Sequence, residues 1–127
     1  MKSISIIIPA LNEEQGIGGV IQGIPVAELR TLGYSTEVLV IDNGSTDDTA
    51  KIAKMNNATV IIQPLRGYGN AYKAGFAHAS GDIIATGDAD LTYPFSILPA
   101  TLKRMDKLNT VRDGLGNILH IFRKRFL

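Results

Sequence analysis

Two aspartates, Asp88 and Asp90, lie two positions apart just after an apolar run of the type that forms a buried strand. Two carboxylates this close repel each other, and a shared divalent cation relieves the repulsion. Carboxylates combined with substrate phosphates are usual ligands of Mg²⁺, and Mn²⁺ accepts the same hard oxygen ligands. The pair therefore predicts a metal or nucleotide site. A surface turn without a ligand is the alternative interpretation.

Residues 9–14 and 42–47 also place polar side chains directly after apolar runs. In the second segment, Asp42 precedes a glycine turn, where a carboxylate can accept hydrogen bonds from a nucleobase or a ribose. A turn followed by a helix cap accounts for the neighbouring Ser, Thr and Gly without any ligand. Of the residues in this segment, Asp42 is the one that this alternative accounts for least well. In the first segment, Glu13 and Glu14 considered alone are favourable charges at a helix N-terminus.

The fourth polar segment, residues 66–70, combines Arg66 with two glycines before a helical stretch. A guanidinium and backbone amides in this arrangement can approach phosphate oxygens. The segment is not a dinucleotide-binding fingerprint, because Tyr72 stands where the last glycine is required. His78 and His120 have no partner at metal-ligand spacing, so we interpret both as structural.

The elements that must position these residues alternate along the chain. Short β-branched runs predict buried strands at residues 3–10, 37–41, 59–63 and 82–86. Helical patterns predict helices at residues 15–30 with a break at Pro25, 46–55, 71–79 and 96–108. The alternation predicts an α/β fold, with an open, mostly parallel sheet and flanking helices. Because ligands bind beyond the carboxyl ends of such strands, the four polar segments are expected to form one site.

Composition and charge limit the class of protein. A hydrophobic fraction of 45% and a net charge of +1 exclude a disordered chain and a general nucleic-acid binder. Residues 1–100 contain six Lys/Arg and ten Asp/Glu, which makes this part acidic. Residues 101–127 contain seven Lys/Arg and two Asp/Glu, which makes the end of the chain basic. The basic end predicts an anionic partner such as phosphate or a lipid surface, and a solvated helix face explains it equally well. Residues 113–116 are expected to form a turn.

The absence of cysteine excludes a disulfide scaffold and a thiolate nucleophile, and it favours a reducing compartment. No apolar run approaches the ~20 residues needed to span a bilayer. We therefore expect a cytoplasmic protein, with peripheral contact at the cytoplasmic face of the membrane through the basic segment.

Four motifs, taken together and in order, resemble those of the family 2 glycosyltransferases, which have a GT-A (Rossmann-like) nucleotide-sugar-binding fold. They read IIIPALNEE, VLVIDNGSTDDT, RGYGNAYKAGFAHASGD and TGDADLTYP. The resemblance is to the polyprenyl-phosphate branch, the dolichyl-phosphate mannosyl- or glucosyltransferase-like proteins. It implies a nucleotide-sugar-binding domain at residues 1–108 and a basic amphipathic segment at 109–127, whose last part faintly resembles a later helix of relatives. Family members continue well beyond the D-x-D loop, so the resemblance implies a fold that is shortened on its C-terminal side and incomplete.

The resemblance implies a donor site built from all four motifs. The residues that would line the nucleotide pocket, meet the base or turn the chain beside it are Pro9, Ala10, Asn12, Glu13, Asp42, Gly44 and Ser45. Those that would lie along the donor are Arg66, Gly67 and Lys73. Asp88 would face the ribose or the metal, and Asp90 would be the metal ligand, for Mg²⁺ or Mn²⁺. The catalytic set is then Asp88, Asp90, Arg66 and Lys73. The family often has Asp where this chain has Asn43, and we expect that change to be neutral.

The implied activity is transfer of a sugar from a UDP-glucose- or GDP-mannose-type donor to a polyprenyl or dolichyl phosphate, with inversion and with a divalent cation. A lipid phosphate is already ionised at neutral pH, so it can attack the anomeric carbon without a strong protein base. The alternative is a nucleotide-sugar-binding fragment, or a half-domain completed by a partner, that does not turn over. A nucleic-acid partner is not expected, and an oligomer is possible.

Overall fold

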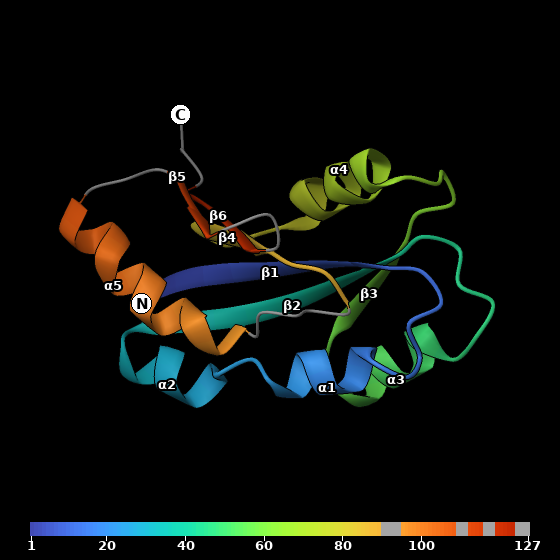
Figure 1. The fold of residues 1–127 in the computed structure, drawn as a ribbon, viewed down its shortest axis with the longest axis horizontal. Helices are drawn as coiled ribbons and strands as arrows, with labels where there is room; N and C mark the ends of the chain where they lie inside the picture. The colour runs from blue at the N-terminus through green and yellow to red at the C-terminus, as the bar shows by residue number, and fades with distance from the viewer. Residues whose placement is uncertain (90–94, 109–111, 116–118, 124–127) are drawn as a thin grey trace.

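The computed structural model describes residues 1–89, 95–108, 112–115 and 119–123 of the 127-residue chain. Within these residues, a sheet of six strands lies among helices (Figure 1). The strands are β1 (Lys2–Ala10), β2 (Tyr34–Asp42), β3 (Thr59–Ile62), β4 (Ile83–Thr86), β5 (Arg112–Leu115) and β6 (Leu119–Arg123). The helices are α1 (Ile17–Gln22), α2 (Val26–Thr31), α3 (Thr49–Met55), α4 (Tyr68–His78) and α5 (Leu98–Leu108), which follows the 3₁₀ turn η1 (Phe95–Ile97). No helix in this described part of the chain is long and apolar enough to cross a membrane.

The sheet has the strand order β3-β2-β1-β4-β6-β5. β1 pairs in parallel with β2 and β4, and β2 pairs in parallel with β3. The register sets Ala10 beside Asp42 and Asp42 beside Ile62. The carboxyl ends of β1, β2 and β3 therefore meet at one edge of the sheet. The expected open, mostly parallel α/β sheet is confirmed.

Two apolar cores lie on opposite faces of the sheet, because side chains of a strand alternate between its faces. Ile4, Ile6 and Ile8 of β1 pack with residues of α1, α2, α3 and α5 in the larger core. Ile7 packs with residues of β2 and α4 in the smaller core. Figure 1 shows α1, α2 and α3 on one side of the sheet and α4 on the other. A Cβ added to Gly75 of α4 would lie 2.5 Å from Ile7 Cγ2, so glycine permits this close approach of α4 to β1.

The predicted break at Pro25 is present, since α1 ends before this residue and α2 begins after it. The predicted helix over residues 46–55 is too long at its start. Helix α3 begins at Thr49, with Asp48 at its N-cap, because residues 45–48 form a loop held by hydrogen bonds to residues 12–14.

The structure also differs from the expectation near the C-terminal end. Residues 112–115 form β5 rather than a turn, and residues 119–123 form β6 where the resemblance suggested a helix. β6 runs antiparallel to β4. It forms backbone hydrogen bonds with the edge of β4 opposite the one that pairs with β1. Part of the segment 109–127 thus shares the sheet with residues 1–108, while the division at residue 108 stays a prediction.

Candidate functional site

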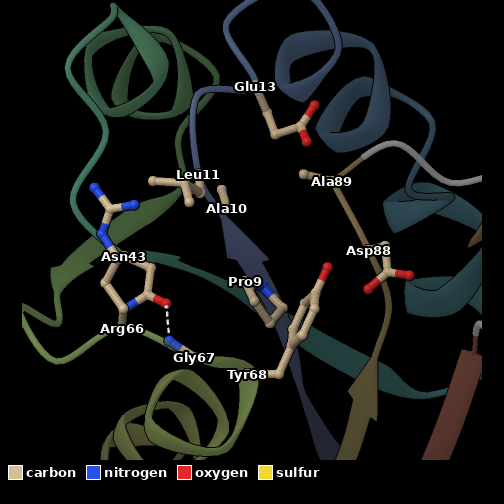
Figure 2. Close-up of a pocket in the computed structure, with 10 residues that line it drawn as sticks. All are labelled: Pro9, Ala10, Leu11, Glu13, Asn43, Arg66, Gly67, Tyr68, Asp88 and Ala89. Atoms are coloured by element: carbon tan, nitrogen blue, oxygen red, sulfur yellow. Dashed lines mark hydrogen bonds between the residues drawn. The ribbon is translucent and has the colours of Figure 1, made fainter.

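A pocket of about 290 Å³ opens beyond the carboxyl ends of β1, β2 and β4, in front of the first turn of α4. Figure 2 shows its walls, which come from segments far apart in the sequence. The lining residues are Pro9, Ala10, Leu11, Glu13, Asn43, Arg66, Gly67, Tyr68, Asp88 and Ala89. Described residues of all four polar motifs therefore lie at this edge of the sheet.

The loops after β1 and β2 are joined by reciprocal hydrogen bonds. The backbone N–H of Asn12 donates to Ser45 Oγ at 2.9 Å, and Asn12 Oδ1 accepts from the backbone N–H of Thr46 at 2.8 Å. Asn12 adopts a positive φ of 53°, a conformation that asparagine tolerates better than most residues. The N–H of Glu13 donates to Thr49 Oγ1 at 2.9 Å. These bonds fix the loop after β1, and Figure 2 shows the Glu13 carboxylate directed into the pocket.

Asp47 completes this junction between the two loops. Its carboxylate accepts hydrogen bonds from the Thr49 hydroxyl, from the Thr49 N–H at 3.0 Å and from the Glu14 N–H at 3.2 Å. The Thr49 side-chain hydrogen bond, followed by the backbone bonds, stabilises the charged form and holds the pKa of Asp47 below its usual 3.8. Asp47 is therefore a residue of the junction, and it does not line the pocket.

The pKa of Asp47 gives stability a dependence on acid. A carboxyl group whose pKa is lower in the folded state stabilises the fold above its unfolded pKa, and this contribution is lost as pH falls through the folded pKa. We expect Asp47→Asn to lower the urea midpoint at neutral pH. The gap from the wild type should close as pH falls below about 3.8. An equal difference between the urea midpoints of the wild type and Asp47→Asn at neutral pH and at a pH below about 3.8 would contradict this role.

Asp42 ends β2 and is buried, with 5% of its surface exposed. Its Oδ1 accepts a hydrogen bond from the Ser45 N–H at 2.8 Å, and Gly44 between them has a φ of 100°. A Cβ at Gly44 would lie 3.9 Å from Arg66 Nε, so the Arg66 guanidinium lies beside this turn. Asp42, Gly44 and Ser45 do not line the pocket. They form a turn that borders it, next to Arg66.

Asp88 lies on the opposite wall. The Gly87 N–H donates to the Ile7 carbonyl at 3.2 Å, which continues the pairing with β1 to the residue before Asp88. Burial and the negative charge of Asp88 both raise the pKa of the Tyr72 phenol. The Asp88 carboxylate therefore faces the side of α4 that carries Tyr72 closely enough to affect its ionisation. Tyr72 stacks on Tyr68, with ring centroids 6.3 Å apart. In Figure 2 the Tyr68 hydroxyl points into the space between Pro9, Asp88 and Ala89.

The structure brings most of the predicted residues together. Those that line the pocket are Pro9, Ala10, Glu13, Arg66, Gly67 and Asp88. Those that form the bordering loops are Asn12, Asp42, Gly44 and Ser45. Lys73 is exposed on α4 and does not line the pocket. Asp90 lies outside the described residues. Sequence reasoning missed Leu11, Asn43, Tyr68 and Ala89, and their only signal was their position inside the four motifs.

The described residues do not form a complete metal cage by themselves. No group of three or more His, Cys, Asp or Glu side chains that could hold a metal ion occurs among residues 1–89, 95–108, 112–115 and 119–123. Glu13 and Asp88 nevertheless place two carboxylates on the walls of one pocket. Hard oxygen ligands of this kind, completed by substrate phosphates, suit Mg²⁺ and Mn²⁺.

A family model described as "Glycosyl transferase family 2" matches residues 5–118. The chain is 44% identical over 112 residues to the low-salt glycan biosynthesis hexosyltransferase of Haloferax volcanii, covering 88% of this chain and 25% of that protein. It is 36% identical over 135 residues to an undecaprenyl-phosphate 4-deoxy-4-formamido-L-arabinose transferase of Klebsiella pneumoniae, covering 98% of this chain and 40% of that protein.

The fold is similar to glucosyl-3-phosphoglycerate synthase of Mycobacterium tuberculosis, in a crystal structure with Mn²⁺, UDP and glucosyl-3-phosphoglycerate. The TM-score is 0.68 at 37% identity, covering 82% of this chain and 39% of that chain. Another structure of that enzyme contains Mg²⁺ and UDP. The expected GT-A fold is thereby confirmed, and the chain spans less than half the length of each of these relatives. With the family match over residues 5–118, the chain belongs to glycosyl transferase family 2.

Proposed function

We propose that the chain forms the donor-binding part of a glycosyltransferase that moves a sugar, with inversion, from a nucleoside-diphosphate sugar to a polyprenyl or dolichyl phosphate. The observation that carries the proposal is the pocket itself. It brings Glu13, Arg66 and Asp88 together at the carboxyl ends of parallel strands, where α/β folds bind nucleotides.

The two sides of the pocket suit different parts of such a donor. Pro9, Ala10 and Leu11 form an apolar wall on which a flat nucleobase would lie, close to the turn after Asp42. Arg66 on the same side would bind the phosphates, because a planar guanidinium holds two phosphate oxygens at once. Lys73 remains a proposed second cation along the donor, and its place on the exposed part of α4 gives it less support.

Asp88 and Asp90 would hold the divalent cation, Mg²⁺ or Mn²⁺. Asp88 is half-buried at a fixed position after β4, and Glu13 supplies a second carboxylate in the same pocket. When bound, such a cation stabilises the negative charge of the departing nucleoside diphosphate. The relative from Mycobacterium tuberculosis, with Mn²⁺ or Mg²⁺ beside UDP, supports this assignment.

The acceptor is proposed to be a lipid phosphate. The transferase of Klebsiella pneumoniae named for undecaprenyl phosphate supports this choice, whereas the synthase of Mycobacterium tuberculosis supports a small phosphorylated acceptor. The basic residues of the segment 109–127 would contact an anionic membrane in the first case. A second candidate function is donor binding by these 127 residues without turnover. It is favoured by the pocket, whose lining residues all belong to the four motifs proposed to bind the donor.

A transfer assay tests the proposal and separates these candidates. The purified chain is incubated with Mn²⁺ and with UDP-glucose or GDP-mannose, and either undecaprenyl phosphate in detergent or 3-phosphoglycerate is added. A glycosylated lipid is the expected product. Product only with 3-phosphoglycerate would contradict the lipid acceptor. Donor binding without any product would support the second candidate.

A further inference from the structure

The side chain of Asn43 is hydrogen-bonded to the segment between β3 and α4, residues 63–67. Its amide nitrogen donates to the carbonyls of Gln63 and Leu65, at 2.9 and 2.8 Å. Its Oδ1 accepts from the Gly67 N–H at 3.0 Å, the bond drawn in Figure 2. Only 7% of Asn43 is exposed. Both amide hydrogens and the amide oxygen are therefore committed to the segment between β3 and α4.

The backbone of Asn43 is fixed independently of these bonds. It directly follows β2, and its N–H donates to the Ala10 carbonyl at 2.9 Å, at the end of β1. The side chain thus projects from a fixed point just beyond the carboxyl end of β2. Its hydrogen bonds hold the segment 63–67 in place. Residues 64–67 of this segment are exposed, and Gly67 has a φ of 111°.

That segment carries the pocket's cation. Arg66 lies between Leu65 and Gly67, and both of these neighbours bond to Asn43. Holding the two neighbours fixes the direction in which the Arg66 side chain leaves the backbone, beside Gly44. Fixing a group before the ligand arrives improves binding, because less conformational entropy is lost on association.

We propose that Asn43 is a positioning residue for donor binding, and that it acts through its amide group by holding residues 63–67 in the binding conformation. The proposal rests on the proposed function. It also replaces the expectation that aspartate at this position is equivalent. An ionised carboxylate has no hydrogen to donate, so it would face the carbonyls of Gln63 and Leu65 while still accepting from Gly67.

The test compares Asn43→Asp with Asn43→Ala by calorimetric titration, using whichever of UDP-glucose and GDP-mannose binds the wild type with Mn²⁺. At neutral pH both variants are expected to bind the donor about tenfold more weakly, or worse. As pH is lowered, the new carboxyl group regains a donor hydrogen when it becomes protonated, and burial raises its pKa above the usual value of a carboxyl group. The affinity of Asn43→Asp relative to the wild type should therefore recover in acid, and that of Asn43→Ala should not.

The other titratable or charged groups that line or border this pocket are Asp42, Glu13, Arg66, Tyr68 and Asp88, and they are the same in the wild type and in both variants. The ratio to the wild type thus isolates the new carboxyl group. Asn57→Asp is the matched control for added charge. Asn57 is exposed after the end of α3 and does not line the pocket. Its affinity should stay within about threefold of the wild type.

A second readout does not need the donor. Hydrogen exchange of the Gly67 amide should be at least about tenfold faster in Asn43→Ala, while the amides of β1 keep their protection. Unchanged exchange would overturn the proposal, and so would equal recovery of both variants in acid or wild-type affinity of Asn43→Asp at neutral pH. If the Gly67 amide exchanges faster in Asn43→Ala but the wild type binds neither donor, the proposed function and the role of Asn43 in donor positioning are both contradicted. Only the attachment of residues 63–67 by Asn43 would then remain supported.

Discussion

Asp88→Asn is expected to weaken donor binding in the presence of Mn²⁺ by about tenfold or more, equivalent to at least about 1.4 kcal/mol. The substitution keeps the size of the side chain and removes a negative charge from the wall of the pocket. A neutral amide is a poorer ligand for a hard cation than a carboxylate, so the metal-dependent part of binding should fall most. Calorimetric titration with and without Mn²⁺ measures both parts.

Asp48→Asn is the matched control for the loss of one charge. Asp48 is exposed at the start of α3, and its side chain makes no capping hydrogen bond. Affinity close to that of the wild type is expected. A further readout is independent of any donor: because Asp88 contributes to the raised pKa of Tyr72, Asp88→Asn should shift that phenol to a lower pKa. Equal losses of affinity in the Asp88 and Asp48 variants would contradict a role for Asp88 in the site.

Gly81→Ala is expected to destabilise the fold by about 3 kcal/mol, the upper range for overpacking a close-packed site. Gly81 is buried before β4, and an added Cβ would lie 2.5 Å from the backbone nitrogen of Ser5 and 2.9 Å from the Ile4 carbonyl carbon. Both contacts involve the backbone of β1, which cannot rotate away. The Gly81 N–H also donates to Ser5 Oγ at 2.8 Å, and the new methyl group would disturb that bond.

Urea denaturation compares this variant with Gly19→Ala. Gly19 lies inside α1 with nothing within 4 Å of an added Cβ, so alanine there should be neutral or slightly stabilising. The glycine-to-alanine change is thus the same at both positions, and only the neighbouring atoms differ. A loss at Gly81 no larger than at Gly19 would show that β1 does not approach as closely as described.

The parallel part of the fold could be predicted because its signals are local. Strands buried on both faces are continuous runs such as SISIIIPA, and they need no knowledge of their partners. β5 and β6 could not be predicted in this way. The sequence of β5, Arg-Asp-Gly-Leu, has no strand pattern, and it becomes a strand because β6 offers it a hydrogen-bonding edge. The start of α3 was misplaced for a similar reason, since Asp47 bonds to Glu14, a residue distant in sequence.

The candidate site was predictable as a set of loops but not in the division of roles within them. Asn12 and Ser45, expected to line the pocket or turn the chain beside it, hold the two loops together. Asn43, considered a neutral variant, has three hydrogen bonds to one segment, and no sequence pattern encodes those partners. Tyr68 lines the pocket because α4 begins one residue after Gly67, earlier than the helical pattern at residues 71–79 predicted.

Donor binding itself is measured most directly by titrating the folded chain with UDP-glucose and with GDP-mannose, each with and without Mn²⁺. Circular dichroism and a cooperative urea transition establish beforehand that the chain is folded. The expected result is binding of one of the two donors, with an affinity that falls when Mn²⁺ is removed. Binding of neither donor by the folded chain in the presence of Mn²⁺ would contradict the assignment of this pocket to a nucleotide sugar.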